Sequence, residues 1–317
     1  MNELYSLFSE ELNKNLPELG GEGKNVMTRG VGGSASSVKL QLNYIPIVLD
    51  LDYYRNPRSS DNPMGDYKAA YRLFTLADGA SRLTPYFERE CSVSIIWRNI
   101  VSCASTVSQY VANALVEAQN VLRSSQMSGL GGVPENWYLV NAIPSNWHDL
   151  VQDKNNLTRI EFDAQNVSDS SGWNVNHSDL VALDKESSLD KISLDVLNVE
   201  FVRPWLSMDL LDLPWKINGL KQGFFSAGDK ESNNGAFPLI TRSMLIGTNL
   251  SLEGRFTSRD MNLLSAADEN LSIGPFAVKT AQNPAEIKQE KDKILVTSNT
   301  TQVVGFTSWH VPLCPQM

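Results

Sequence analysis

The spacing of apolar residues changes from a helical to a strand-like period along this 317-residue chain. Between about residues 64 and 127 apolar residues recur every three or four positions, whereas after about residue 157 they alternate with polar residues in short runs. The first spacing is typical of a helix face, and the second of a strand with one buried face. Because the two patterns are segregated, we predict an α+β fold, with helices packed on a mainly antiparallel, β-rich C-terminal half.

One pair of alternating runs predicts a strand whose buried face changes. Ile192, Leu194 and Val196 alternate with polar residues, and the alternation then moves by one position. Leu197, Val199 and Phe201 form the second run. A bulged or twisted strand would produce this change.

The distribution of glycine divides the chain into three predicted regions. Six glycines fall between residues 19 and 37, directly after a short amphipathic stretch. We therefore expect a helix with a Gly-rich arm at residues 1–33, a mixed and mainly helical region at 34–155, and a β-rich region at 156–317. The alternative is that residues 34–317 form one domain.

The N-terminal stretch carries an apolar stripe at helical spacing, formed by Leu4, Leu7, Phe8 and Leu12. A helix this short is not stable alone in water. We expect the stripe to dock on a partner, tethered by the Gly-rich arm.

Residues from Val93 to about Ser125 show the most regular helical pattern in the chain. Apolar positions step alternately by four and three, which predicts one long helix with a seam of three heptads. Val107, Val111 and Ala114 lie at the centre of this seam and are our second set of candidate interaction residues.

Three environments are open for this helix. It could be a core helix, or a helix that pairs with its copy in another subunit. It could also be a helix that is sheltered in a soluble form of the protein and leaves that form to line a pore. Residues 99–116 carry no charge and reach the length of a membrane span. Their many Asn, Ser, Thr and Gln side chains argue against an ordinary transmembrane helix.

Charge and cysteine content restrict the partners and the compartment. With 27 basic and 36 acidic residues the chain carries a net charge of −9, so it lacks the basic surface that nucleic acid requires. The charged N-terminus has no signal-peptide pattern, and three widely separated cysteines are typical of a reducing compartment. We expect a cytoplasmic protein; export without a signal peptide stays an open alternative.

The residues that carry catalytic or metal chemistry form no recognisable motif. The three histidines are far apart, and no Cys pair has zinc-site spacing. Asp50-Leu51-Asp52 resembles the metal motif of many glycosyltransferases in three residues, but no nucleotide-binding βαβ unit precedes it. We expect its carboxylates to face water and Cys103 to be a small buried residue in its helix. The sequence predicts no catalytic residue, metal or cofactor.

Seven tryptophans are numerous for a chain of this size. We expect them to pack in the core rather than stack on sugars. Two of them end the similar segments 134–137 and 144–147, which we predict to be turns.

Together these observations favour a non-catalytic assembly or macromolecule-binding protein that acts through self-association, as a homo-oligomer or with a protein partner. The first alternative is a membrane-active, pore-forming protein with a concealed amphipathic helix. The second is an enzyme or carbohydrate binder whose site is assembled from dispersed residues.

Overall fold

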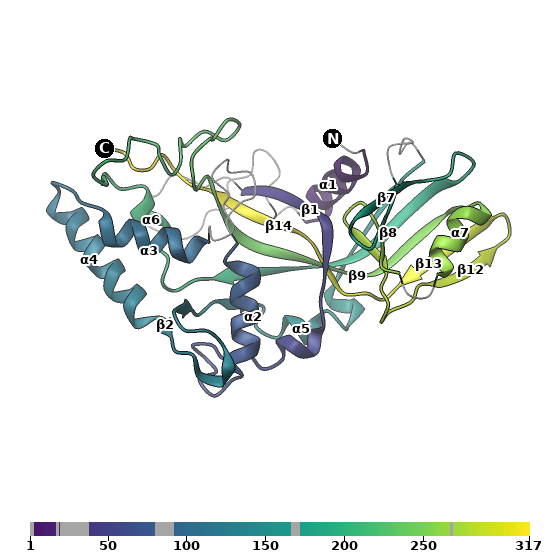
Figure 1. Cartoon of the computed structure of the whole chain (residues 1–317), viewed down its shortest axis with the longest axis horizontal. Coiled ribbons are helices and arrows are strands. Elements are labelled where there is room, and N and C mark those ends of the chain that lie inside the picture. The colour runs from purple at the N-terminus through teal and green to yellow at the C-terminus, as the bar shows by residue number, and fades with distance from the viewer. Residues whose placement is uncertain (1–2, 17–18, 20–37, 80–91, 166–171, 267–268) are drawn as a thin grey trace.

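An eight-stranded sheet runs along the long axis of the molecule (Figure 1). The computed structural model describes residues 3–16, 19, 38–79, 92–165, 172–266 and 269–317. Within these ranges the helices lie mostly in the N-terminal half and the antiparallel sheet mostly in the C-terminal half, which confirms the predicted α+β fold. The α-helices are α1 (Glu3–Asn15), α2 (Tyr67–Ala77), α3 (Val93–Cys103), α4 (Gln109–Ser124), α5 (Trp147–Leu150), α6 (Met208–Leu211) and α7 (Ser258–Ser265).

Two long antiparallel strands, β8 and β9, form the centre of the sheet. At one end the strand order is β4-β8-β9-β14-β1, and at the other it is β5-β8-β9-β13-β12. A second sheet has the order β11-β10-β6-β7, and β2 pairs with β3. The strands are β1 (Val38–Val48), β2 (Gln126–Met127), β3 (Trp137–Tyr138), β4 (Asn141–Ile143), β5 (Thr158–Asp163), β6 (Gly172–Val175), β7 (Asp179–Ala182), β8 (Ser188–Val202), β9 (Leu239–Arg255), β10 (Leu271–Ile273), β11 (Phe276–Lys279), β12 (Glu286–Glu290), β13 (Lys293–Ser298) and β14 (Gln302–His310).

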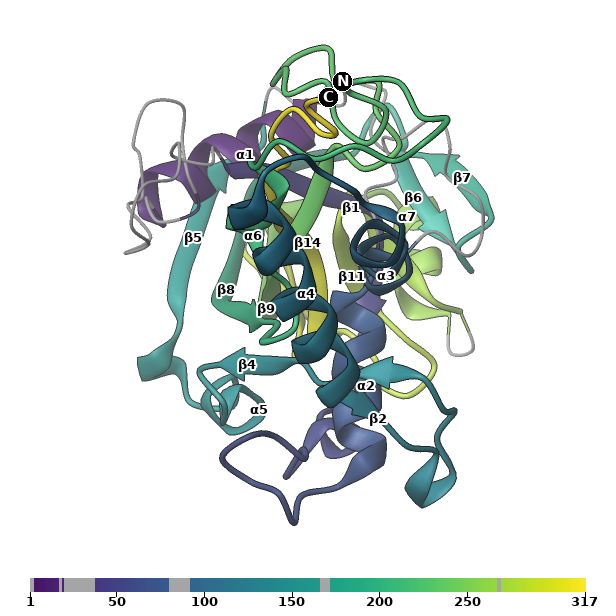
Figure 2. The ribbon, with the colours of Figure 1, turned by 90° about the vertical axis from the view of Figure 1, so that its left-hand side faces the viewer.

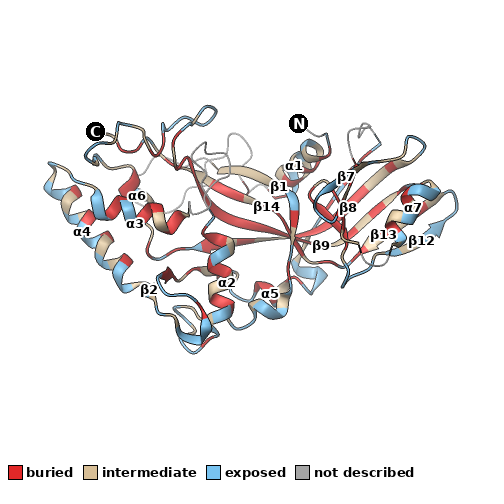
Figure 3. Ribbon diagram, viewed as in Figure 1, coloured by how far each residue is buried: buried red, intermediate tan, exposed pale blue. Residues whose placement is uncertain are grey.

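The two ends of β8 belong to two different cores, which cover opposite faces of the sheet (Figure 3). Ile192, Leu194 and Val196 pack in a β core with α1 and the second sheet. Val199 and Phe201 pack in a helical core with α2, α3 and α4. Successive strand residues point to opposite faces. The predicted change of buried face is therefore confirmed, and its cause is a change of core along the strand.

A β-bulge in β9 places Leu245 and Leu250 in the same core, although five positions separate them. Asn249 and Leu250 together face Leu194 of β8, so β9 contains one extra residue at this point. Asn249 has φ +51° and donates from Nδ2 to Asp195 Oδ2 at 2.9 Å. The Arg159 guanidinium donates to the other Asp195 oxygen at 2.9 Å. The extra residue moves the alternation by one, which turns Leu250 toward the β core.

Two buried charged side chains, Asp78 and Arg203, join the helices to the sheet. The carboxylate of Asp78, which directly follows α2, accepts hydrogen bonds from the Ser94 amide at 2.8 Å and the Ser94 hydroxyl at 2.6 Å in α3. Burial raises the pKa of Asp78, and the hydrogen bonds and Arg203 oppose that change. Arg203 is fully buried, which lowers its pKa to about 10, and it donates to the carbonyls of Ala77 and Thr241.

Helix α1 packs on the body of its own chain. Leu4, Phe8 and Leu12 are completely buried in the β core, and Leu7 is half-buried. The Phe8 ring meets Phe276 edge-on, with 4.8 Å between ring centroids. The sequence suggested that the stripe docks on a partner. In the structure the stripe is instead covered by the rest of its own chain. An apolar stripe does not reveal whether its complement lies in the same chain. The predicted linker at residues 20–37 lies outside the described residues, and the division into three regions stays a prediction.

Most sequence-predicted elements are present, with one correction after β1. Tyr67–Ala77 is helical, and the alternating segments of the C-terminal half are strands. The alternation of apolar residues from Leu49 to Tyr53 predicts a strand with Tyr53 on its buried face, but residues 51–54 form a 3₁₀ turn. Asp50 caps this turn by accepting a hydrogen bond from the Asp52 amide. Both carboxylates are exposed, as predicted, but Tyr53 is exposed too. Six of the seven tryptophans are buried, which confirms the core interpretation for Trp97, Trp137, Trp147, Trp173, Trp205 and Trp215.

Truncating Phe8 tests the internal role of α1. We expect Phe8→Ala to lower the free energy of unfolding by about 3 to 5 kcal/mol, because it removes a completely buried ring from a packed core. Urea titration followed by circular dichroism measures the change, with half-buried Leu7→Ala as the milder comparison. Wild-type stability of Phe8→Ala would contradict the packing of α1 on its own chain.

Two substitutions at Asn249 separate the backbone requirement of the bulge from its hydrogen bond. Asn249→Gly and Asn249→Ala both lose the bond to Asp195, but only alanine suffers the steric cost of positive φ. We expect the alanine variant to be less stable than the glycine variant by about 1 kcal/mol in the same titration. Equal stability of the two variants would show that this bulge does not require the left-handed conformation.

Candidate functional site

The sequence-predicted helix from Val93 to Ser125 is two helices, α3 and α4, joined by residues 104–108. In this junction Ser105 and Lys216 exchange two backbone hydrogen bonds of 2.8 Å, and the Thr106 hydroxyl donates to Pro214 O at 2.9 Å. Ser108 then caps α4 by accepting from the Val111 amide. Hydroxyl side chains that bind nearby backbone groups compete with helix formation. The prediction of one continuous helix is therefore wrong.

The break changes the environment of the predicted seam. Val111 is buried, with 2% of its surface exposed, and Ala114 is half-buried. Val107 lies in the junction and is 92% exposed, so it is not a buried seam residue. Cys103, which we expected to be buried, ends α3 and is exposed. The observed buried face of α4 packs near α3 and α6 and consists of Val111, Leu115, Ala118 and Leu122.

The opposite side of α4 is exposed at one end of the molecule. Seen from that end, α4 stands in front of the other elements (Figure 2). Tyr110 is 73% exposed and Val116 is 55% exposed. We call this side the α4 outer face; its exposed residues are Gln109, Tyr110, Asn113, Val116, Glu117, Asn120, Arg123 and Ser124.

The α4 outer face carries one negative and one positive charge. Glu117 and Arg123 are the charged residues of α4, and neither forms an ion pair within the described part of the chain. Six residues of helix separate them by about 9 Å along the axis. Asn120 lies midway between them. The remaining polar groups are the hydroxyls of Tyr110 and Ser124 and three amides, of which Gln109 donates to Asn113 Oδ1 at 2.9 Å.

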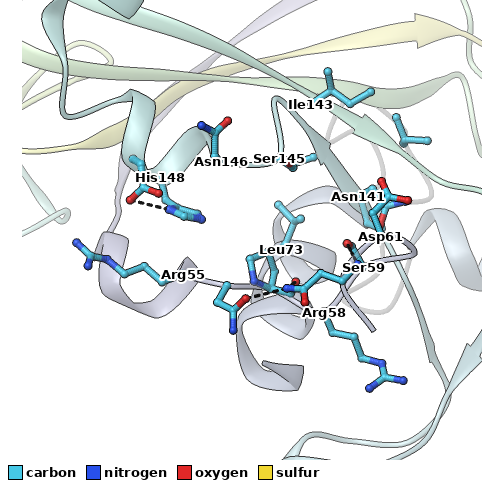
Figure 4. Close-up of a pocket in the computed structure, with 17 residues that line it drawn as sticks. Arg55, Arg58, Ser59, Asp61, Leu73, Asn141, Ile143, Ser145, Asn146 and His148 are labelled. Carbon is cyan, nitrogen blue, oxygen red and sulfur yellow. Dashed lines mark hydrogen bonds and ion pairs between the residues drawn. The ribbon is translucent and has the colours of Figure 1, made fainter. Parts of the chain in front are cut away.

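A polar cleft of about 940 Å³ lies near α2 and α5 (Figure 4). One wall is the loop of residues 55–62, and the other is formed by residues 140–149. No sequence pattern indicates this cleft, since the two segments are about 80 residues apart and contain no spaced motif. The one available signal was the predicted turn at residues 144–147, which supplies Ser145 and Asn146 to the rim.

The described residues offer little for metal or thiol chemistry. They contain no group of three or more His, Cys, Asp or Glu side chains placed to hold a metal ion. Asp52 instead pairs with Arg55, with 3.0 Å between Nε and Oδ1. Burial raises the pKa of the Cys314 thiol to about 12. A thiol with such a pKa is a poor nucleophile at neutral pH.

Two further findings bear on function. None of the helices in the described ranges is both long and apolar enough to cross a membrane. No protein-family model, curated protein or solved structure matches this chain.

The two valines of the predicted seam test whether α3 and α4 are separate helices, because the structure buries Val111 and exposes Val107. We expect Val111→Ala to lower the free energy of unfolding by about 1 to 3 kcal/mol, because two methyl groups leave a packed site. Val107→Ala should change it by less than about 0.5 kcal/mol, because that side chain lies in solvent. Chemical denaturation measures both. Equal effects of the two substitutions would contradict the observed break between α3 and α4.

Proposed function

We propose that this protein is a non-catalytic assembly protein that self-associates by pairing the α4 outer face with the same face of a second copy. One observation carries the proposal. The outer face is exposed along the helix, and its two unpaired charges are of opposite sign and equidistant from Asn120. A surface with that arrangement is complementary to itself under two-fold rotation.

The arrangement of charges selects an antiparallel pair of helices. A two-fold axis through Asn120 places Glu117 opposite Arg123 of the partner subunit, and the same contact occurs a second time on the other side of the axis. A parallel pair would instead place Glu117 beside Glu117 of the partner subunit. Complementary charges fix orientation and register more than they add affinity.

Burial of exposed apolar surface supplies the attraction. Val116 lies on the outer face within one turn of Asn120, and Tyr110 lies farther toward the N-terminus of α4. Removing such side chains from water contributes about 25 cal/mol per Å² of apolar area. Asn120 lies at the proposed axis and can hydrogen-bond with its copy in the second subunit, because an amide both donates and accepts.

Two features of the structure restrict which predicted interaction residues the proposal uses and which alternative function it favours less. Leu4, Phe8 and Leu12 are buried in the β core, so the proposal does not use them. The pore-forming alternative depended on one long uncharged helix. That stretch is divided between helices of 11 and 16 residues, whereas a membrane span needs about 20.

Charge reversal tests the antiparallel register. We expect the wild type to dimerise and Glu117→Arg or Arg123→Glu alone to weaken the dimer at least about tenfold, since each homodimer then has like charges at both contacts. An equimolar mixture of the two variants should associate again, because one α4 is then wholly basic and the other wholly acidic at these positions. Analytical ultracentrifugation at several concentrations measures all three cases.

Glu290→Arg on strand β12 is the control, since it makes the same change in charge at an exposed position outside α4. It should dimerise like the wild type. A monomeric wild type at high micromolar concentration would refute self-association. Failure of the mixture to associate would refute this register even if the wild type is a dimer.

A further inference from the structure

The loop that forms one wall of the polar cleft is held in place by its own hydrogen bonds. Asn62 donates from Nδ2 to Asn56 Oδ1 at 2.8 Å and to Pro57 O at 3.1 Å. The Asp66 amide, at the start of α2, donates to Asn56 O at 2.7 Å. Across the cleft Asn141 Nδ2 donates to Ser60 Oγ at 3.2 Å. The walls are thus formed before any ligand binds, as in most small-molecule sites.

Two buried polar groups at the cleft lack partners. His148 is 6% exposed, and its Nδ1 has no hydrogen bond. Asp149 Oδ1 lies 3.2 Å from this nitrogen but outside hydrogen-bond geometry. The buried Oδ1 of Asn141 also has no partner. Figure 4 shows the His148 ring on the cleft side of α5, facing the 55–62 loop. Buried polar groups are seldom left unpaired unless a ligand or water completes them.

The orphaned atoms indicate what the ligand must offer. The Nδ2 of Asn141 donates to Ser60 Oγ, so the atom of this amide that lacks a partner is its oxygen. An amide oxygen only accepts hydrogen bonds, so the ligand must donate one. The dianion of a phosphate monoester and a carboxylate accept hydrogen bonds but do not donate them, so neither can satisfy this oxygen. A hydroxyl group does both. A ligand with several hydroxyls can therefore satisfy Asn141 and also use the Asn, Ser and His groups around it.

The charges of the cleft do not favour an anion either. Arg55 and Arg58 are balanced by Asp61 and Asp149 among the lining residues. Arg55 is paired with Asp52, and the Arg58 guanidinium lies over the Tyr67 ring at 4.5 Å. In Figure 4 both guanidinium groups point away from the centre of the cleft. The site is therefore neutral where a ligand would lie.

We propose that this cleft binds a neutral saccharide. Its amide and hydroxyl groups match sugar hydroxyls, and the apolar side chains of Leu73, Ile143 and Val202 also line it and suit the C–H face of a sugar ring. The cleft shares no residue with the α4 outer face, so this inference does not depend on self-association.

Calorimetric titration with defined probes tests the inference. The probes are the methyl glycosides of glucose, galactose, mannose and N-acetylglucosamine and the β-linked disaccharides of the same sugars, with methyl phosphate and acetate as acceptor-only anionic probes. We expect saturable binding of at least one neutral saccharide and none of either anion. Asn141→Ala and Asn146→Ala should each weaken that binding about tenfold.

Asn262→Ala, at an exposed position on α7, is the matched control and should bind like the wild type. Asn146 makes no helix-capping hydrogen bond with its side chain, so its variant remains informative if Asn141→Ala does not fold. Binding of methyl phosphate or acetate in place of sugars would overturn the inference. So would the absence of saccharide binding, or wild-type affinity in the two cleft variants.

Discussion

The long ladder between β8 and β9 is the constraint on which the rest of the structure depends, because it supplies buried residues to two cores on opposite faces of one sheet. Strict alternation through β9 would place Leu245 and Leu250 on opposite faces. The extra residue at Asn249 returns both to the β core. Asn249 is hydrogen-bonded to Asp195, and Asp195 to Arg159, so this small polar cluster helps to determine which apolar residues are buried.

The helical core in turn positions both candidate sites. Arg203 follows β8 directly and donates to the end of α2, while Asp78 binds the start of α3. These contacts fix the two helices relative to the sheet, and α4 then packs near α3. The start of α2 is bonded to the loop that forms the cleft. A change at buried Asp78 or buried Arg203 would therefore reach both sites through rigid elements, whereas a change in the β core would not touch either directly.

The sequence predicted elements well where one face alone is buried. The run from Ile192 to Phe201 revealed its change of face because polar residues separate its apolar positions. Residues 239–248 gave no such signal, because that half of β9 is buried on both faces. At residues 104–108 the apolar spacing continued across a junction whose conformation is set by bonds to Pro214 and Lys216, which no local pattern contains. The cleft was missed for the same reason: its walls meet only in the folded chain.

The composition of the α4 outer face sets the strength that its pairing can have. Exposed ion pairs contribute about 0.2 to 1 kcal/mol each, and amide contacts largely replace hydrogen bonds to water. Two such ion pairs with modest apolar burial give a weak, reversible dimer that weakens further with salt, since charges are screened beyond about 8 Å at physiological ionic strength. A tighter assembly would need apolar residues where Asn113 and Asn120 stand. Those amides keep the exposed helix compatible with water as a monomer, so association through this face responds to protein concentration and is not a condition of folding.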